Sequence, residues 1–206
     1  LTINNMKISI IIPYKADRGY LDAAVRSVEC QSFKNFEIIE SKSDALAGHN
    51  FNEGVKRATG DLVRYLCDDD MLAPDSLYHT NRLWSNGWDF AHGNALNFWP
   101  DGRQQIHVPA IQVPTLADML NANQIHGGSV VYHARVFERY QFDPELWTAE
   151  EYDFNMSLLS GGCSIGYIPE TLYLYRRHAQ QKSLGNTNPA YQFKRNEIKR
   201  FIKMTF

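Results

Sequence analysis

Residues 7–13 read Lys-Ile-Ser-Ile-Ile-Ile-Pro, and this run sets the fold class. A short β-branched run that ends at a proline predicts a strand buried on both faces, as in a parallel sheet. Helical spacing follows over 20–31, where the apolar residues are Leu21, Ala24, Val25 and Val28. A strand over 36–39, a helix over 50–58 and a strand over 61–66 complete a βαβαβ pattern. We therefore expect an α/β fold with a mixed, mainly parallel central sheet flanked by helices.

The rest of the chain continues in alternating elements. We expect helices over 74–84, 116–121 and 150–159, a helical turn over 134–140, and strands over 88–98, 127–132, 165–168 and 171–175. The tail over 190–206 has the pattern of a basic amphipathic helix, which either lies on an anionic membrane surface or packs on its own or a neighbouring domain. No internal repeat or linker interrupts the chain, so residues 1–206 are predicted to form one domain.

Composition excludes several classes of protein. The 206 residues carry a formal net charge of −2, which gives no overall field that favours nucleic acid. Cys30, Cys67 and Cys163 have no paired spacing, which argues against a disulfide framework and a zinc site. No apolar run approaches the roughly 20 residues of a membrane-spanning helix. A reducing, cytoplasmic setting is the simplest expectation.

An acidic triplet, Asp68-Asp69-Asp70, follows the strand predicted over 61–66. Ligands of open α/β sheets bind beyond the carboxyl ends of the strands. Three adjacent carboxylates repel one another, and a divalent cation removes that cost. Oxygen ligands suit Mg²⁺ or Mn²⁺, which would normally also bind a substrate diphosphate. The alternative is a solvated acidic turn that caps the helix starting near Pro74.

Short motifs along the chain occur in a recognisable order. They are Ile8 to Pro13, Gln31-Ser32-Phe33, Asn35 to Ile39, Asn52-Glu53-Gly54, Ala58 to Asp61, Leu66 to Leu72, Gly127-Gly128-Ser129, Ala149 to Phe154 and Tyr175 to His178. Over residues 7 to 183 this series resembles family 2 glycosyltransferases, which have the Rossmann-like GT-A fold. More weakly, the chain resembles the amino-terminal transferase domain of a chlorella-virus glycan-synthesis protein.

The resemblance implies an inverting hexosyltransferase that uses Mn²⁺ or Mg²⁺. It moves a sugar from a UDP-sugar, with UDP-glucose as the first choice, to a hydroxyl of a glycan or glycoconjugate. Residues 7–100 would form the nucleotide-sugar-binding half and residues 101–185 the acceptor and catalytic half. The sequence departs from the family at Cys67, where many members have an aspartate, at Glu151, where the base is usually aspartate, and in the shortened segment 40–44.

Each functional role is assigned to matching residues. Metal binding is expected at Asp70, Asp69 and His178. The nucleotide sugar is expected to contact Pro13, Lys15, Glu40, Asn52, Asp68, Asp69 and Arg176. Acceptor or sugar contacts are expected at His126, Gly128, Trp147, Glu150 and Asp153. Structural roles remain as alternatives for these residues. Lys15, Arg176 and His178 are also typical of a solvated surface, and His126 and Trp147 are also typical of side chains that only pack in the core or on the surface.

Glu151 is the expected general base, which must lie within hydrogen-bond reach of the acceptor hydroxyl. Neighbouring carboxylates at Glu150 and Asp153 would raise the pKa of one of the group. The alternative is an acidic helix start that favourably meets the helix dipole. Two other functions remain: a catalytically silent nucleotide-sugar-binding module, and a sugar nucleotidyltransferase. The second needs a glycine-rich phosphate loop, whereas residues 14–19 contain one glycine.

Overall fold

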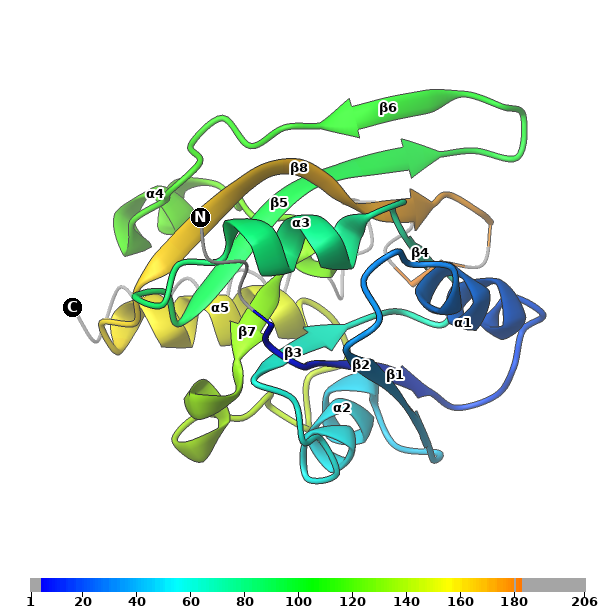
Figure 1. Cartoon of the computed structure of the whole chain (residues 1–206), viewed down its shortest axis with the longest axis horizontal. Helices are drawn as coiled ribbons and strands as arrows, with labels where there is room; N and C mark the ends of the chain where they lie inside the picture. The colour runs from blue at the N-terminus through cyan, green and yellow to red at the C-terminus, as the bar shows by residue number, and fades with distance from the viewer. Residues whose placement is uncertain (1–4, 180, 183–206) are drawn as a thin grey trace.

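A computed structural model describes residues 5–179, 181 and 182 of the chain (Figure 1). The predicted basic helix over 190–206 lies outside these residues. The described elements, in chain order, are β1 (Ile8–Tyr14), α1 (Leu21–Glu29), β2 (Phe36–Lys42), α2 (Ala47–Val55), β3 (Leu62–Tyr65), β4 (Met71–Leu72), α3 (Ser76–Leu83), β5 (Phe90–Phe98), β6 (Gln104–His107), α4 (Leu116–Asn121), the 3₁₀ turn η1 (Gly127–Ser129), β7 (Val131–His133), the 3₁₀ turn η2 (Ala134–Glu138), α5 (Glu150–Ser160) and β8 (Ile165–Arg176).

One sheet runs through the structure in the order β2-β1-β3-β7-β5-β8-β4, with β6 beside β5. The parallel ladders join β1 to β2, β1 to β3 and β5 to β8, and they hold most of the paired residues. The pairings β3–β7, β5–β7, β5–β6 and β4–β8 are antiparallel. The sheet is therefore mixed and mainly parallel, as the sequence predicted.

Helices cover both faces of the sheet (Figure 1). On one face Ile8, Ile10 and Ile12 of β1 belong to a buried cluster with α1 and α3. On the other face Ile11 belongs to a cluster with α2, α4 and α5. Successive side chains of a strand point to opposite faces, so a run of isoleucines fills both clusters at once.

Several boundaries differ from the predictions. The segment predicted as a strand over 127–132 is the 3₁₀ turn η1 followed by β7. The strands predicted over 165–168 and 171–175 are one strand, β8, whose register against β5 shifts between Gly93 and Ala95. Strands β4 and β6 were not predicted, and α2 begins at Ala47, three residues before the predicted start.

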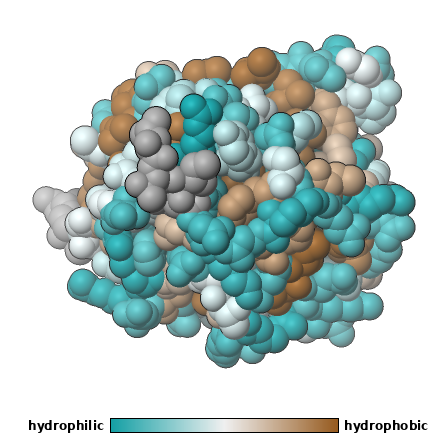
Figure 2. Space-filling model, in the orientation of Figure 1, coloured by the Kyte–Doolittle hydropathy of each residue, from teal (hydrophilic) through white to brown (hydrophobic). Residues whose placement is uncertain are grey.

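Large hydrophobic side chains are exposed along β6 and the segment after it, at Ile106, Val108, Ile111 and Val113 (Figure 2). Hydrophilic residues cover much of the rest of the face in Figure 2, with a further hydrophobic patch in its lower right part. Within the described part of the chain, no helix has the length and apolarity needed to cross a bilayer.

Candidate active site

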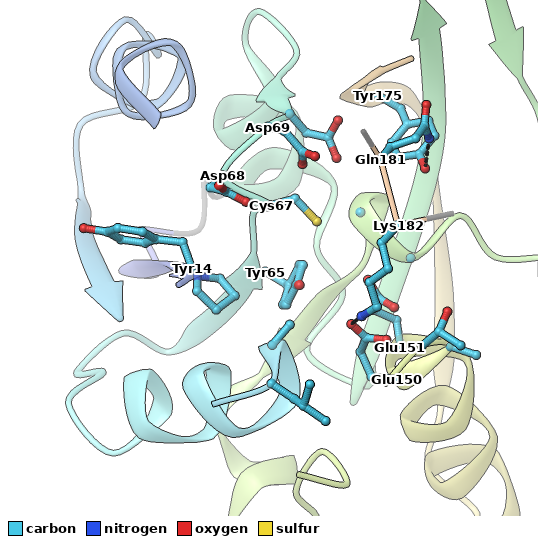
Figure 3. A pocket seen from close by; sticks show the side chains of 18 of the residues that line it. Tyr14, Tyr65, Cys67, Asp68, Asp69, Glu150, Glu151, Tyr175, Gln181 and Lys182 are labelled. Carbon is cyan, nitrogen blue, oxygen red and sulfur yellow. Dashed lines mark hydrogen bonds and ion pairs between the residues drawn. The ribbon is translucent and has the colours of Figure 1, made fainter. Parts of the chain in front are cut away.

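A cavity of about 710 Å³ opens where β1 and β3 end (Figure 3). The β1 end and the following loop contribute its first wall, and the turn after β3, with Cys67 and the acidic triplet, contributes the second. The start of α2, the segment that ends in η1, the start of α5 and β8 contribute the remainder. The carboxyl ends of parallel strands meet at one edge of a sheet, and this is where open α/β folds bind ligands.

Asp70 is the most buried carboxylate of the acidic triplet, with 1% of its surface exposed. Its oxygens accept hydrogen bonds from the Tyr173 hydroxyl at 2.8 Å and from the Arg176 backbone N–H at 2.7 Å. Burial raises the pKa of Asp70 well above its usual range, and the Asp69 charge raises it further. The carboxylate is therefore fixed in place against β8, where added positive charge would stabilise its ionised form.

Asp68 and Asp69 both accept hydrogen bonds from one arginine, Arg18, in the β1–α1 loop. Arg18 donates from Nη2 to Asp68 Oδ1 at 2.8 Å and to Asp69 Oδ2 at 2.9 Å. His178 Nε2 lies 3.0 Å from the same Asp69 oxygen. The His178 ring packs beside Tyr20 at a centroid distance of 5.1 Å. His178, which was expected to bind the metal, thus contacts the acidic triplet through Asp69.

The acidic turn brings together a set of side chains that can bind a cation. One ligand atom each from Cys67, Asp69 and Asp70 lies within 4.8 Å of the others. Carboxylate oxygens suit Mg²⁺ and Mn²⁺, whereas the thiol is a softer ligand. Burial raises the pKa of both the Cys67 thiol and the Asp70 carboxyl well above their usual values, and a bound cation would favour the ionised form of each. The donor set therefore fits an oxygen-preferring divalent cation.

Glu151 stands in the first turn of α5 and lines the same cavity. Among the described residues, no side chain forms a hydrogen bond or ion pair with it. Burial raises the pKa of Glu151 to about 7, with a further contribution from the Glu150 charge. The neighbouring Glu150 is instead paired, because Lys182 Nζ donates to it at 2.8 Å (Figure 3). Glu151 is thus the carboxyl of the two that can exchange a proton near neutral pH.

Two glycines of η1 allow close packing at this wall. A Cβ on Gly127 would lie 3.0 Å from the Glu151 Cβ. A Cβ on Gly128 would lie 2.1 Å from the Tyr173 ring, whose hydroxyl holds Asp70. Gly128 was expected to contact the acceptor, and it lines the cavity. The structure adds a packing reason for a glycine at this position.

Other expected contacts divide between the cavity and its surroundings. Pro13, Lys15, His126, Trp147 and Glu150 line the cavity, and Trp147 remains 52% exposed at its rim. The His126 ring lies 5.0 Å from the Tyr175 ring, and burial lowers the pKa of His126 to about 4.

Four of the expected nucleotide and acceptor contacts lie outside the residues that line the cavity, as does the expected metal ligand His178. Glu40 is exposed on β2, where it accepts from the Tyr14 hydroxyl at 2.8 Å. Asn52 exchanges two hydrogen bonds with the Phe142 backbone, which ties α2 to a distant loop. The Arg176 guanidinium packs over Tyr20 and donates to the Asp69 carbonyl at 2.8 Å. Burial and the Asp143 charge raise the pKa of Asp153 to about 6, away from the cavity.

Sequence reasoning assigned no role to several residues that complete the site. Arg18 lies in an irregular loop, and Tyr173 lies in a strand that reads as ordinary core. Lys182 lies four residues after His178, in a segment that was expected at the site. This position was the one signal in the sequence that could have indicated a role for Lys182. Ion pairs that join residues 32 to 51 positions apart are set by the folded chain, and no local sequence pattern reports them.

Known proteins with similar sequences are glycosyltransferases. No family model matches the chain. An uncharacterised glycosyltransferase of Rickettsia conorii is 26% identical over 229 positions, which cover 91% of this chain and 37% of that protein. One of Haemophilus influenzae is 23% identical over 204 positions, covering 94% of this chain and 54% of that protein. The chain resembles glycosyltransferases. It spans about a third to a half of the length of these relatives.

Solved structures show the same fold. Staphylococcus aureus TarS 1–349 in complex with UDP-GlcNAc matches with a TM-score of 0.73 and 17% identity, over 96% of this chain and 65% of that one. The mannosyltransferase PcManGT of Pyrobaculum calidifontis, in complex with GDP-Man and Mn²⁺, matches with a TM-score of 0.60 and 12% identity, over 86% and 58%. The predicted GT-A fold is confirmed, and the sequence relatives support a glycosyltransferase; membership of family 2 stays a prediction.

Proposed function

We propose that the chain transfers a hexose from a UDP-sugar to an acceptor hydroxyl with inversion and with the help of a divalent cation. One observation carries this proposal: a single cavity brings the acidic turn after β3 together with Glu151 of α5. The acidic turn can hold a cation that binds a diphosphate, and Glu151 can accept the proton of a hydroxyl group. The UDP and UDP-GlcNAc complexes of TarS support a UDP-linked donor.

Departure of the nucleoside diphosphate requires compensation of its growing negative charge. Asp69 and Asp70 are the residues that would hold Mn²⁺ or Mg²⁺, with His178 beside Asp69. The cation, when bound, supplies Lewis-acid stabilisation of the diphosphate. The chain itself fixes the Asp70 carboxylate through Tyr173 and the Arg176 backbone. The Mn²⁺ complex of the mannosyltransferase neighbour supports the use of a divalent cation.

Glu151 is the proposed general base. A base works best when its pKa lies near the operating pH, because it is then ionised yet still basic. Its pKa of about 7 meets this requirement. The base activates the acceptor hydroxyl for attack on the anomeric carbon from the side opposite the leaving group. A single displacement of this kind inverts the anomeric centre, as in inverting glycosidases that activate a nucleophile across the ring.

The rim of the cavity suits a carbohydrate acceptor. The half-exposed Trp147 presents an aromatic face at the opening, and Lys182 Nζ lies 5.6 Å from its ring centroid. An indole combines a large apolar surface with an N–H donor, which suits the mixed faces of a sugar ring. His126 lines the interior and is held neutral by burial at physiological pH. We therefore place a glycan or glycoconjugate at this side.

A donor panel tests the proposal. The purified protein is incubated with UDP-glucose, UDP-GlcNAc or GDP-mannose, each with Mn²⁺, Mg²⁺ or EDTA, and released nucleotide is measured. We expect release from a UDP-sugar that requires a divalent cation. Release that is equal in EDTA would overturn the metal role, and a preference for GDP-mannose would overturn the UDP assignment.

A catalytically silent sugar-nucleotide-binding module is the second candidate. The ion pairs of Arg18 with Asp68 and Asp69 favour it, because they occupy carboxylates that a cation would need. This candidate predicts tight UDP binding without nucleotide release from any donor. Absence of both binding and release would exclude the two candidates together.

A further inference from the structure

Arg18 is a cavity residue whose two partners both belong to the acidic turn. Its Nη2 lies 2.8 Å from Asp68 Oδ1 and 2.9 Å from Asp69 Oδ2, and its Nε lies 3.4 Å from Asp68 Oδ2. Its side chain is 35% exposed, whereas the side chains of Asp68 and Asp69 are 11% and 14% exposed. The guanidinium therefore supplies positive charge to two carboxylates that are largely withdrawn from water.

A cation at Asp69 and the guanidinium of Arg18 compete for the same charge. Asp69 is one of the ligands that would hold the cation, and Arg18 already donates to its Oδ2. Two positive groups within a few ångströms repel each other strongly in a partly buried site. A bound diphosphate changes this balance, because its oxygens accept the planar pair of guanidinium N–H donors as well as a carboxylate does.

The loop that carries Arg18 is fixed at both ends, so an exchange of partners needs to move mainly the side chain. Tyr14 ends β1, and the Tyr20 carbonyl accepts from Ala23 and Ala24 at the start of α1. Between them, Asp17 Oδ1 accepts from the Gly19 N–H at 2.7 Å, with Gly19 at a φ of +85° that suits glycine. Arg18 also lines the cavity, as do Pro13 and Lys15.

We propose that Arg18 is a donor-binding residue that neutralises Asp68 and Asp69 in the absence of donor and binds the diphosphate once a divalent cation is held at Asp69. This inference rests on the proposed function. It assigns Arg18 opposite effects on the two ligands. Arg18 opposes the binding of the cation alone, and it favours the binding of the nucleotide in the presence of the cation. A purely structural arginine would support both or affect neither.

The test measures Mn²⁺ alone and UDP at saturating Mn²⁺ by calorimetry, on wild type, R18Q and R135Q. Arg135 is a matched control, because its side chain is 39% exposed and its Nε pairs with Asp89 at 2.8 Å away from the cavity. For R18Q we expect about tenfold tighter Mn²⁺ binding and about tenfold weaker UDP binding, the scale of a charged hydrogen bond. R135Q should leave both affinities at the wild-type value.

The outcomes separate this inference from the proposed function. If wild type binds both ligands but R18Q binds Mn²⁺ no more tightly, or UDP equally well, the Arg18 inference is wrong while the proposed function stands. If wild type binds neither ligand, the proposed function fails, and the inference fails with it. Should R18Q not fold, R18K replaces it, because a point charge keeps the ion pairing but lacks the planar fork. Its UDP affinity should then fall while its melting temperature stays near wild type.

Discussion

The acidic turn after β3 and the first turn of α5 both present carboxylates to one cavity. The two sets of carboxylates differ in their hydrogen-bond partners. Asp68, Asp69 and Asp70 accept hydrogen bonds from Arg18, His178, Tyr173 and the Arg176 backbone. Among the described residues, Glu151 has no side-chain hydrogen-bond or ion-pair partner, and its pKa is raised to about 7. Burial raises the pKa of Asp70 as well, so the contrast lies in the hydrogen bonds. Two donors hold Asp70 in position, whereas no side chain among the described residues holds Glu151.

This difference indicates that the acidic turn and the first turn of α5 have different roles in the cavity. The fixed carboxylates suit the binding of a cation and, through it, a diphosphate, because preorganised ligands need not rearrange when the cation binds. The unpaired carboxyl suits proton transfer, which needs a pKa near the working pH. Each variant below removes one side of this contrast, and each should therefore change binding and turnover by different amounts.

Removal of the most fixed carboxylate should have the largest effect. Asp70→Asn keeps the shape of the side chain but removes its charge, so metal-dependent UDP binding should fall by about a hundredfold or more and transfer should be lost with it. Calorimetry with UDP and Mn²⁺ measures the change. Asp101→Asn is the control, since Asp101 pairs with Arg103 on an exposed turn. Equal UDP affinities of Asp70→Asn and wild type would contradict a metal role for Asp70.

Disturbing the support of Asp70 should have a smaller but measurable effect. In Gly128→Ala the new Cβ would lie 2.1 Å from the Tyr173 ring, so Tyr173 must move away from Asp70. We expect a loss of about 1–3 kcal/mol in the free energy of unfolding and weaker UDP binding. Gly87→Ala is the matched control, because a Cβ there meets no atom within 4 Å. Thermal denaturation that is identical in the two variants would show that Tyr173 yields without cost.

The pH dependence of transfer reports the other side of the contrast. Burial raises the pKa of Glu151 to about 7, and the base works only when it has lost its proton. The rate should therefore fall about tenfold per pH unit below about pH 7 and level off above it. The measurement is kcat at saturating donor and acceptor. A rate that is constant between about pH 5 and 8 would exclude Glu151 as the titrating base.

The smallest expected change is a shift of that profile. Lys182 lowers the pKa of Glu151 by its charge, and Glu150 raises it. Lys182→Gln should therefore move the pH–rate profile to higher pH, and Glu150→Gln should move it to lower pH. The two variants serve as controls for each other, because a general loss of structure would not give shifts of opposite sign. Shifts in the same direction would show that the pair acts through packing.

The sequence predicted the parts of the fold that local patterns encode. The continuous apolar run at Ile8 to Ile12 and the helical spacing over 20–31 reproduce β1 and α1 closely. Strand β6 was not predicted, because Gln104 to His107 is a polar, largely exposed edge strand without the apolar pattern of the other strands. Strand β8 read as two strands because Pro169 and Glu170 interrupt its apolar pattern. They lie where its register against β5 shifts, a common position for proline in a sheet.

The site was predictable as far as its residues stand in short motifs. The acidic triplet and Glu151 were expected, and they line one cavity. Glu40 was expected at the nucleotide, but the alternation of β2 buries Ser41 and turns Glu40 to the surface. Arg18 and Tyr173 were not expected, because their partners lie 50 and 103 positions away along the chain. Long-range pairing of this kind follows from topology, which the local sequence does not report.

The central claim is that Glu151 moves a proton while the acidic turn holds the donor. The most direct test compares UDP affinity at saturating Mn²⁺ with the rate of sugar transfer in Glu151→Gln. We predict an unchanged UDP affinity and a transfer rate lower by about a hundredfold to ten-thousandfold, the usual contribution of a general base. Transfer by this variant at the wild-type rate would contradict the account.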